Sequence, residues 1–227
     1  MRRPNFNEER KLWRHGCRFV IGIDEVGRGP LAGPVVACAF CFKEVDKEAG
    51  PPLGGLASVP IRDSKQLSKK QREEVYKILK KNPNIEWGIG RVSEKTIDKI
   101  NILQATKLAM KKAVINLCQK TYDRGFFTED KFLLVDGNFC LDFQHSDFQK
   151  RGATMQKSII SGDQKVFSIA AASIIAKVHR DRIMERYHNK YPEYGFNLHM
   201  GYGTEFHRKQ IKKHGLCPIH RKSFHVS

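Results

Sequence analysis

Four acidic side chains stand where a folded chain could bring them together. Asp24 and Glu25 end an apolar segment and precede a glycine-rich turn, Asp136 ends a second apolar segment, and Asp163 precedes a long helical pattern. Ligand sites collect at strand ends in open α/β sheets, and unpaired carboxylates are costly to bury there. Divalent cations such as Mg²⁺ and Mn²⁺ prefer carboxylate oxygens and offset that cost. Two such ions about 3.5–4 Å apart can stabilise the attacking and leaving oxygens of a phosphodiester, so the pattern predicts a site for phosphodiester cleavage.

Asp136 and Asp163 also have purely structural interpretations. Asp136 precedes a glycine, and an aspartate in that position is commonly a turn residue. Asp163 stands just before a predicted helix, where an aspartate often serves only as the N-cap. The metal-site hypothesis therefore depends on the joint placement of the acids and not on any one of them.

The charge of the chain indicates a polyanionic partner. Lys and Arg number 41 against 24 Asp and Glu, which gives a formal charge of +17 and a pI near 9.7. Such an excess attracts nucleic acid, although charge that serves only solubility is an alternative. The basic residues are spread along the chain, whereas a membrane anchor usually has a clustered basic segment. We therefore expect nucleic acid as the partner, no membrane, and a monomer, since nothing signals an oligomer.

The start of the chain and its cysteines favour a reducing, cytoplasmic setting. The first residues, MRRPNFNEERKLWRHG, lack the apolar stretch of a secretion signal. Cys38 and Cys41 form a CxxC pattern within an apolar strand, and residues three apart on a strand face opposite sides. We expect the cysteines to pack as small hydrophobic side chains. The histidines at 199, 207, 214 and 220 match no compact zinc spacing, so we expect them at the surface or facing phosphate.

The hydropathy pattern predicts a mixed α/β sheet covered by helices. The expected order is three strands in an antiparallel meander, two helices, two strands and a long helix. Ser68 and Gln71 predict a capping box, and the 43–60 segment is expected to be a loop. The predicted strands are 19–24, 35–42, 85–92, 131–136 and 153–160, and the predicted helices are 68–80, 102–118, 164–189 and 204–214.

Several long motifs resemble a known family. The segments VIGIDEVGRGPLAGPVVA, RDSKQLSKKQRE, LLVDGN, SGDQKVFSIAAASIIAKVHRDR and HMGYGTEFHRKQIKKHGLCPIHRKSF are similar, in the same order, to type 2 ribonuclease H, the bacterial ribonuclease HII group. The resemblance covers nearly the whole chain. It implies a ribonuclease H-like fold with a mixed five-stranded sheet flanked by helices and a C-terminal helical region. We expect a catalytic domain over 1–190 and an extension over 191–227 that packs on it as one functional unit.

The resemblance also implies an activity. Asp24, Glu25, Asp136 and Asp163 match the family carboxylates that hold two divalent ions, Mn²⁺ or Mg²⁺. The family hydrolyses the RNA strand of RNA–DNA hybrids and cuts at ribonucleotides embedded in duplex DNA, leaving 5′-phosphate and 3′-hydroxyl ends. Such an enzyme serves replication and ribonucleotide removal.

The resemblance assigns substrate contacts to two glycine-containing elements. Gly27, Arg28 and Gly29 match the family element that reads the 2′-hydroxyl at an RNA–DNA junction, and glycine permits close approach of the backbone to a sugar. Tyr202, between two glycines, matches the tyrosine that stacks on the adjacent deoxyribose. On the residues alone, a plain tight turn and a core tyrosine remain alternatives.

The remaining predicted contacts are supporting ones. Ser64 and Lys65 resemble phosphate contacts of the family, and Lys177 is expected to do the same or to support the site. Asn138 is a candidate to orient Asp136 through a hydrogen bond. We interpret Asp181, far along the helix from Asp163, as a structural partner of Arg180, Arg182 or another basic residue.

Two departures from the family pattern remove positive charge. Ser161 and Met200 stand where the family usually has lysine, which bears on substrate affinity and its salt dependence. Two alternative functions are less consistent with the sequence. A ribonuclease HIII is disfavoured because only about twenty residues precede the first strand and both glycine-containing elements are present. A non-catalytic nucleic-acid-binding module is disfavoured because all four acids are intact.

Overall fold

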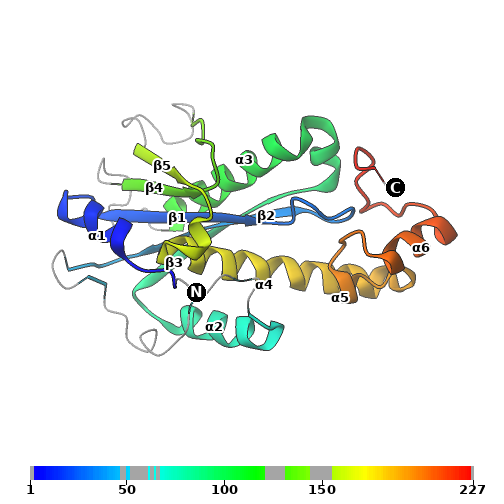
Figure 1. The fold of residues 1–227 in the computed structure, drawn as a ribbon, viewed down its shortest axis with the longest axis horizontal. Coiled ribbons are helices and arrows are strands. Elements are labelled where there is room, and N and C mark those ends of the chain that lie inside the picture. Colours follow the sequence, from blue (N-terminus) through cyan, green and yellow to red (C-terminus); the bar gives the residue numbers. More distant parts are fainter. Residues whose placement is uncertain are drawn as a thin grey trace.

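A computed structural model describes residues 3–46, 50–51, 61, 64, 67–120, 131–143 and 155–225 (Figure 1). Lys65 and most of the expected 43–60 loop lie outside the described residues. Among the described residues, no helix combines the length and the apolar character that crossing a membrane requires.

The core of the fold is a five-stranded mixed sheet in the order β3-β2-β1-β4-β5. β1, β2 and β3 form the expected antiparallel meander, whereas β4 runs parallel to β1 and β5 runs parallel to β4. Every residue of β2 is buried, as expected of a strand covered on both faces. The strands are Phe19–Val26 (β1), Val35–Phe42 (β2), Ile85–Val92 (β3), Lys131–Asp136 (β4) and Met155–Ile159 (β5).

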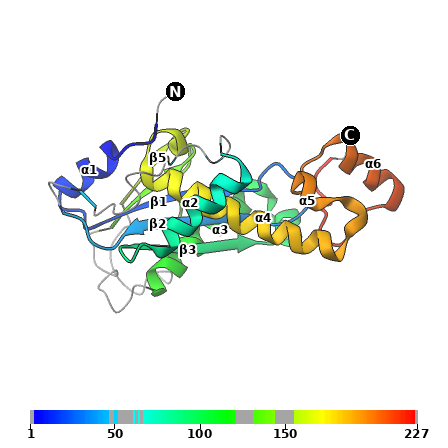
Figure 2. The same ribbon diagram turned by 90° about the horizontal axis from the view of Figure 1, so that it is seen from below.

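Helices cover both faces of the sheet. α3 (Glu94–Lys120) lies on one face, and α4 (Phe167–Lys190) lies on the other with α2 (Lys69–Lys81) outside it (Figures 1 and 2). Cys38 packs in the core under α4 and Cys41 in the core under α3, which confirms that the CxxC pattern spans two faces. Cys38 and Cys41 are thus separated by the sheet, and Cys17 and Cys118 are buried as well. Cys140 is exposed, so the expected packing as a core side chain is wrong for this residue.

A third, smaller core lies at the far end of α4, where the C-terminal elements gather (Figure 1). It includes Leu31, Met184, Tyr194, Phe196 and Ile211. It therefore joins the loop between β1 and β2 to the C-terminal segment. The elements there are η6 (Pro192–Tyr194), α5 (Phe196–His199) and α6 (Glu205–His214).

The structure corrects the predicted order and extends one helix. α2 lies between β2 and β3, so the expected run of three strands before the first helix is wrong. The predicted 102–118 helix belongs to α3, which begins at Glu94 and contains Asn101 at φ 64°. Asn101 Oδ1 accepts a hydrogen bond of 3.1 Å from the amide of Gln104. This side chain caps the second part of α3 where the backbone changes direction.

Other helix ends follow local capping chemistry. Ser68 and Gln71 form the predicted reciprocal capping box at the start of α2. α4 begins at Phe167 because Gly162–Gln164 forms a separate 3₁₀ turn, η5. α1 (Asn7–Arg14) was not predicted because its eight residues carry only two large apolar side chains. Trp13 nevertheless packs into the core on the α4 face.

Candidate metal centre and substrate cleft

Three carboxylates meet at one edge of the sheet. β1 and β4 are parallel neighbours in which Ile23 pairs with Val135, so the next residues along the two strands are Asp24 and Asp136. Ligand oxygens of Asp24, Glu25 and Asp136 lie within 4.8 Å of one another. The parallel register thus assembles the predicted cluster, because both strands end at the same edge.

The fourth predicted acid lies on the turn beside this cluster. Asp163 is in η5 and only 4% exposed. Its neighbour Gly162 donates a main-chain hydrogen bond of 2.6 Å to Asp136 Oδ1. The charge of Asp163 contributes to raising the pKa of Asp24. Asp163 is therefore near the three clustered acids, although it is not one of the group within 4.8 Å.

The buried, mutually repelling carboxylates of the cluster favour the binding of a cation. Burial, followed by the charges of Glu25 and Asp136, raises the pKa of Asp24 well above its usual range. Burial raises the pKa of Glu25 to about 7, against the lowering effect of Arg28. Glu25 Oε2 is buried and has no hydrogen-bond partner among the described residues. An all-oxygen donor set with an unsatisfied carboxylate oxygen fits a hard divalent ion.

A cleft of about 220 Å³ opens beside the acids. It brings together residues from β1, the following turn, α4 and the C-terminal segment, which are far apart in sequence. The residues that line it are Asp24, Glu25, Val26, Gly27, Arg28, Gly29, Ser64, Asp136, Ser173, Lys177 and Tyr202. Among the described residues, the predicted substrate contacts therefore share one cavity with the three clustered acids.

The two glycine-containing elements lie next to each other in the lining of this cleft. Arg28 forms an ion pair of 3.5 Å with Glu25, and its side chain is 46% exposed. A Cβ added at Gly29 would lie 3.7 Å from Cε1 of Tyr202. Tyr202 is 42% exposed, so the alternative of a core tyrosine is excluded. Its position leaves one surface of the ring available to a ligand in the cleft.

Comparisons with known proteins match this arrangement. The family model described as Ribonuclease HII matches residues 21–227. A ribonuclease HII of Chlorobium chlorochromatii (strain CaD3) is 45% identical over 217 residues, covering 95% of this chain and 93% of that protein. The chain belongs to the ribonuclease HII family. It is a metal-dependent endoribonuclease that acts on RNA–DNA hybrids, which excludes the non-catalytic module.

Solved structures support the ribonuclease H-like fold. Ribonuclease H2 from Pyrococcus horikoshii OT3 superposes with a TM-score of 0.63 at 27% identity, covering 92% of this chain and 94% of that one. Bst-RNase HIII in complex with Mn²⁺ superposes with a TM-score of 0.68 at 19% identity, covering 95% and 70% of the two chains. The expected five-stranded mixed sheet flanked by helices is confirmed.

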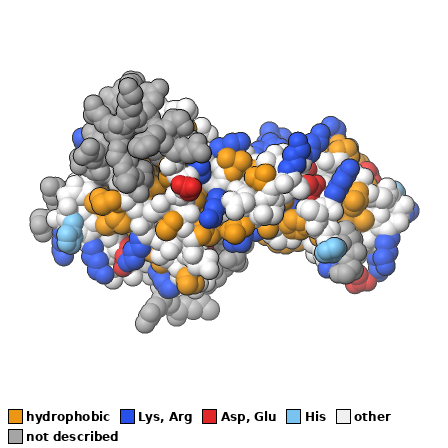
Figure 3. Space-filling model, turned by 90° about the horizontal axis from the view of Figure 1, so that it is seen from above, with side chains coloured by type: hydrophobic (Ala, Val, Ile, Leu, Met, Phe, Trp, Pro, Cys, Tyr) orange, Lys and Arg blue, Asp and Glu red, His pale blue; other side chains and the backbone are white. Residues whose placement is uncertain are grey.

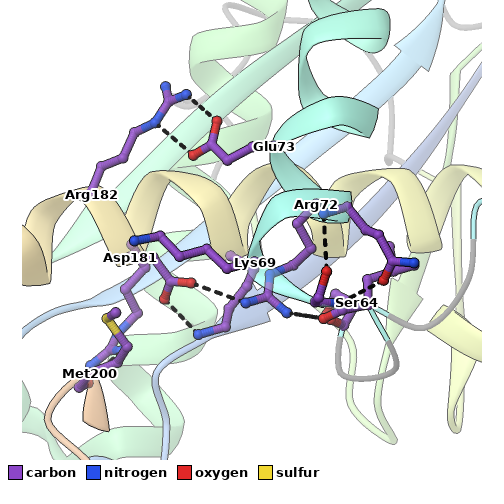
Figure 4. Close-up of polar contacts among 12 residues, drawn as sticks. Ser64, Lys69, Arg72, Glu73, Asp181, Arg182 and Met200 are labelled. Atoms are coloured by element: carbon purple, nitrogen blue, oxygen red, sulfur yellow. Dashed lines mark hydrogen bonds and ion pairs between the residues drawn. The ribbon is translucent and has the colours of Figure 1, made fainter. Parts of the chain in front are cut away.

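A polar network behind the cleft of this ribonuclease HII holds two of the predicted contacts (Figure 4). Lys177 Nζ lies 2.5 Å from Asp181, and Arg72 lies 3.6 Å from the same carboxylate. Arg72 also donates a hydrogen bond of 3.0 Å to the carbonyl of Ser64. Ser64 Oγ in turn lies 2.9 Å from Ser173 Oγ. Asp181 therefore supports both Lys177 and Ser64.

Asp181 does not form an ion pair with Arg180 or Arg182, the two arginines that the sequence suggested as partners. The expected pairing with a basic residue is confirmed, but the partners are Lys177 and Arg72. Arg182 pairs instead with Glu73 at 2.7 Å. Ser173 was missed from the sequence, although its spacing of four residues before Lys177 places both on one face of a helix.

One predicted site residue makes no contact with the site, and another lies outside the described residues. Asn138 is exposed and makes no hydrogen bond to Asp136 in the part of the chain that the structure describes. The main-chain amide of Gly162 fills the supporting role expected of Asn138. Lys65 lies outside the described residues, so its predicted phosphate contact stays a prediction.

The histidine prediction is correct only for His214, which is exposed. His199, His207 and His220 are buried, so the expectation that they lie at the surface or face phosphate is wrong. The amide of Cys217 donates to His220 Nδ1, so the ring hydrogen of His220 is on Nε2, 3.0 Å from His207 Nε2. His207 Nδ1 then donates to the carbonyl of Tyr202 at 2.9 Å. These imidazoles are buried because they satisfy one another and main-chain groups.

The basic side chains are spread over the surface, and the two departures from the family pattern share one backbone feature. Figure 3 shows Lys and Arg side chains spread over the described part of one face rather than gathered in one cluster. Ser161 and Met200, where lysine is usual, both adopt left-handed backbone conformations at φ 54° and φ 51°. The Met200 carbonyl accepts a hydrogen bond of 2.9 Å from Arg180. Position 200 therefore contributes its backbone to the fold while its side chain carries no charge.

Proposed function

We propose that this ribonuclease HII cuts at single ribonucleotides embedded in duplex DNA as well as within the RNA strand of hybrids. We propose that four carboxylates hold two divalent ions, Mn²⁺ or Mg²⁺, and that the products carry 5′-phosphate and 3′-hydroxyl ends. The observation that carries the proposal is the shared cleft, which places the acids beside the turn at Gly27–Gly29 and beside Tyr202. The proposed ligands are Asp24, Glu25, Asp136 and Asp163.

Hydrogen bonds orient two of the proposed ligand carboxylates, those of Asp136 and Asp24. Asp136 uses Oδ1 to accept from Gly162, which leaves its second oxygen free for an ion. Asp24 accepts from the amide of Glu25 at 2.7 Å and from Ser173, so its carboxylate is fixed before an ion binds. Ions held by these carboxylates would supply positive charge to activate water and to stabilise the developing charge on phosphate oxygens. Fixed carboxylates lower the reorganisation that the reaction requires.

The turn after β1 is shaped for close approach of a sugar. Gly27 has φ +96°, and a Cβ there would lie 2.2 Å from Arg180 Nε. Gly27 is therefore required by the fold. Gly29 is different, because a Cβ there would meet only Tyr202, at an ordinary contact distance of 3.7 Å. The protein itself has room for a side chain at position 29, so the space in front of Gly29 is available to a ribose.

Cationic and hydroxyl groups on the other wall suit the phosphate backbone. Lys177 and Ser64 line the cleft and are held by Asp181 and Arg72. Phosphate contacts position a nucleic acid without reading its sequence. We propose that Lys177 and Ser64, together with Lys65, bind phosphates next to the scissile bond.

The two segments 1–190 and 191–227 are proposed to act as one unit. Main-chain hydrogen bonds join the turn after β1 to the C-terminal segment, including Leu31 N to Gly201 O at 2.8 Å and Gly33 N to Ile219 O at 2.8 Å. Tyr202 therefore cannot be placed independently of the turn. We propose further that the enzyme works in the cytoplasm as a monomer.

The decisive experiment compares three substrates: a DNA duplex with one ribonucleotide, a long RNA–DNA hybrid, and an all-DNA duplex. Each is incubated with Mn²⁺, with Mg²⁺ and with EDTA, and the product ends are determined. We expect metal-dependent cleavage on the 5′ side of the single ribonucleotide and none of the all-DNA duplex. Cleavage of the hybrid alone would reject the single-ribonucleotide proposal, and a 3′-phosphate product would reject the mechanism.

A further inference from the structure

The carbonyl groups of the turn after β1 converge on a buried arginine from the end of the chain. Arg221 is 1% exposed. Its Nη1 donates to the carbonyl of Arg28 at 2.8 Å, and its Nη2 donates to that of Gly27 at 2.5 Å. Its Nε and Nη2 both donate to the carbonyl of Gly33, at 3.0 Å and 2.8 Å. One guanidinium therefore fixes both ends of the turn.

This cation is buried without a direct acidic partner. No ion pair joins Arg221 to a carboxylate among the described residues. Burial, followed by the nearby charge of Arg180, lowers the pKa of Arg221 to about 9. Burying a guanidinium costs free energy. Attachment of the C-terminal segment does not need it, since Arg221 N to Leu31 O at 2.9 Å already joins the two main chains.

The orientation of these carbonyls decides where two amides point. Each peptide between residues 27 and 29 is trans and planar, so its N–H points away from its C=O. With the carbonyls of Gly27 and Arg28 directed at Arg221, the amides of Arg28 and Gly29 are directed to the opposite side. Both residues line the cleft. Neither amide has a hydrogen-bond partner in the described part of the structure.

We infer that Arg221 is a positioning residue that presents the amides of Arg28 and Gly29 to the sugar in the cleft and so sets selectivity for ribose. The inference rests on the proposed function, in which this turn reads the 2′-hydroxyl. A cationic donor on a carbonyl also polarises the amide of the same peptide, which strengthens that amide as a donor. The C-terminal segment thereby takes part in selectivity without touching the substrate.

The test measures binding, so that chemistry does not enter. In an Asp136→Asn background with Mg²⁺, the dissociation constants are measured for an all-DNA duplex and for the same duplex with one ribonucleotide. The ratio of the two constants is the ribose selectivity. We expect Arg221→Lys to lower this ratio roughly tenfold, the order expected when two ordinary hydrogen bonds are lost. We expect affinity for the all-DNA duplex to stay unchanged, which a general structural defect would not allow.

Two further variants separate positioning from stability. Ile211→Ala removes packing from the same C-terminal core but no hydrogen bond to Gly27, Arg28 or Gly33. We expect it to lower Tm and leave the ratio unchanged. Phe224→Leu removes the ring that lies 4.9 Å from the Arg221 guanidinium, and we expect a smaller loss of selectivity. This variant gives the answer if Arg221→Lys does not fold.

The outcomes distinguish a failure of the proposed function from a failure of the positioning role of Arg221. If the Asp136→Asn parent itself binds both duplexes equally, the turn does not read ribose and the proposed function fails. If the parent is selective and the Arg221 and Phe224 variants are equally selective, the positioning role of Arg221 is wrong. If Ile211→Ala loses as much selectivity as Arg221→Lys, the effect is one of general stability and the inference is also wrong.

Discussion

The amide of Gly162 donates a hydrogen bond of 2.6 Å to Oδ1 of Asp136. This contact joins the turn that carries Asp163 to the end of β4. It orients one oxygen of Asp136 and leaves the other for a ligand. The fourth acid and the third are therefore held together by the backbone, before any ion binds.

Asp136→Asn is expected to abolish cleavage while preserving the fold. The asparagine oxygen can still accept from Gly162, but a neutral amide is a poor ligand for a hard cation. We expect cleavage of a hybrid to fall by more than roughly 100-fold, the upper range for groups that only support a ligand. Binding of the hybrid should persist. Asp142→Asn, at an exposed acid beyond the cluster, is the control, and wild-type activity in Asp136→Asn would refute the ligand role.

Asp181→Asn is expected to lower stability more than catalysis. Asp181 is 5% exposed and neutralises Lys177 and Arg72. Breaking a buried ionic contact costs on the order of 3 kcal/mol, so urea unfolding should show a loss of that order. Metal affinity should be unchanged, whereas Asp163→Asn should weaken it. A metal-binding defect with a normal Tm in Asp181→Asn would show that Asp181, and not Asp163, is the fourth ligand.

Gly29→Ala is expected to leave the protein stable and impair its activity. A Cβ at position 29 meets only the Tyr202 ring, 3.7 Å away, so unfolding free energy should change by no more than about 0.5 kcal/mol. The methyl group would occupy the space proposed for the ribose. We expect kcat/KM on a single embedded ribonucleotide to drop at least about tenfold. Full activity with unchanged stability would show that no ligand approaches this glycine.

Tyr202→Ala is expected to weaken cutting at a single embedded ribonucleotide. The ring is 42% exposed, and its main chain is held by His207, so removing the ring should not disturb the turn. We expect a loss of about tenfold in kcat/KM, within the range for lost stacking on nucleic acid. Tyr202→Phe keeps the ring and should retain most of the activity. An unchanged rate in Tyr202→Ala would remove the stacking proposal.

Stability without metal is expected to fall as pH rises from about 4.5 to about 7, and Glu9 contributes part of this fall. Glu25, whose pKa is likewise raised to about 7 by burial, contributes in the same direction. Glu9 is 1% exposed and accepts from the amide of Ser168 at 2.8 Å, and burial raises its pKa to about 7 from 4.5. The folded state therefore binds a proton that the unfolded state releases over this range. The stabilising effect is fully present below about 4.5 and is lost by about 7. The shift corresponds to roughly 3 kcal/mol.

Urea unfolding at pH 5 and pH 7.5 in EDTA checks this expectation. Glu9→Gln should show a smaller fall in unfolding free energy between the two pH values than the unaltered enzyme shows. Glu8→Gln is the control, because the hydrogen bond from Lys157 lowers the pKa of Glu8. Parallel pH dependence in Glu9→Gln and the unaltered enzyme would refute the assignment.

Much of the fold and the site was predictable because it depends on local patterns. The strands 35–42, 85–92 and 131–136 were predicted with the bounds that β2, β3 and β4 have. Their apolar runs are long enough to require burial. Asp24, Glu25 and Asp136 could be recognised because acids at the ends of such strands have few structural uses. The substrate contacts were predicted only from the family motifs.

Only the tertiary structure decided how distant polar groups are paired. The sequence determined that Asp181 needs a basic partner, but several lay within reach, and packing of α2 on α4 selected Arg72 beside Lys177. In the same way, nothing local marks Arg221 as a partner of the carbonyl of Gly27. Hydropathy and capping act between neighbours along the chain, and they fix strands, helix ends and the positions of the acids. Hydrogen bonds between residues nearly two hundred positions apart depend on where whole elements pack, which no local pattern encodes.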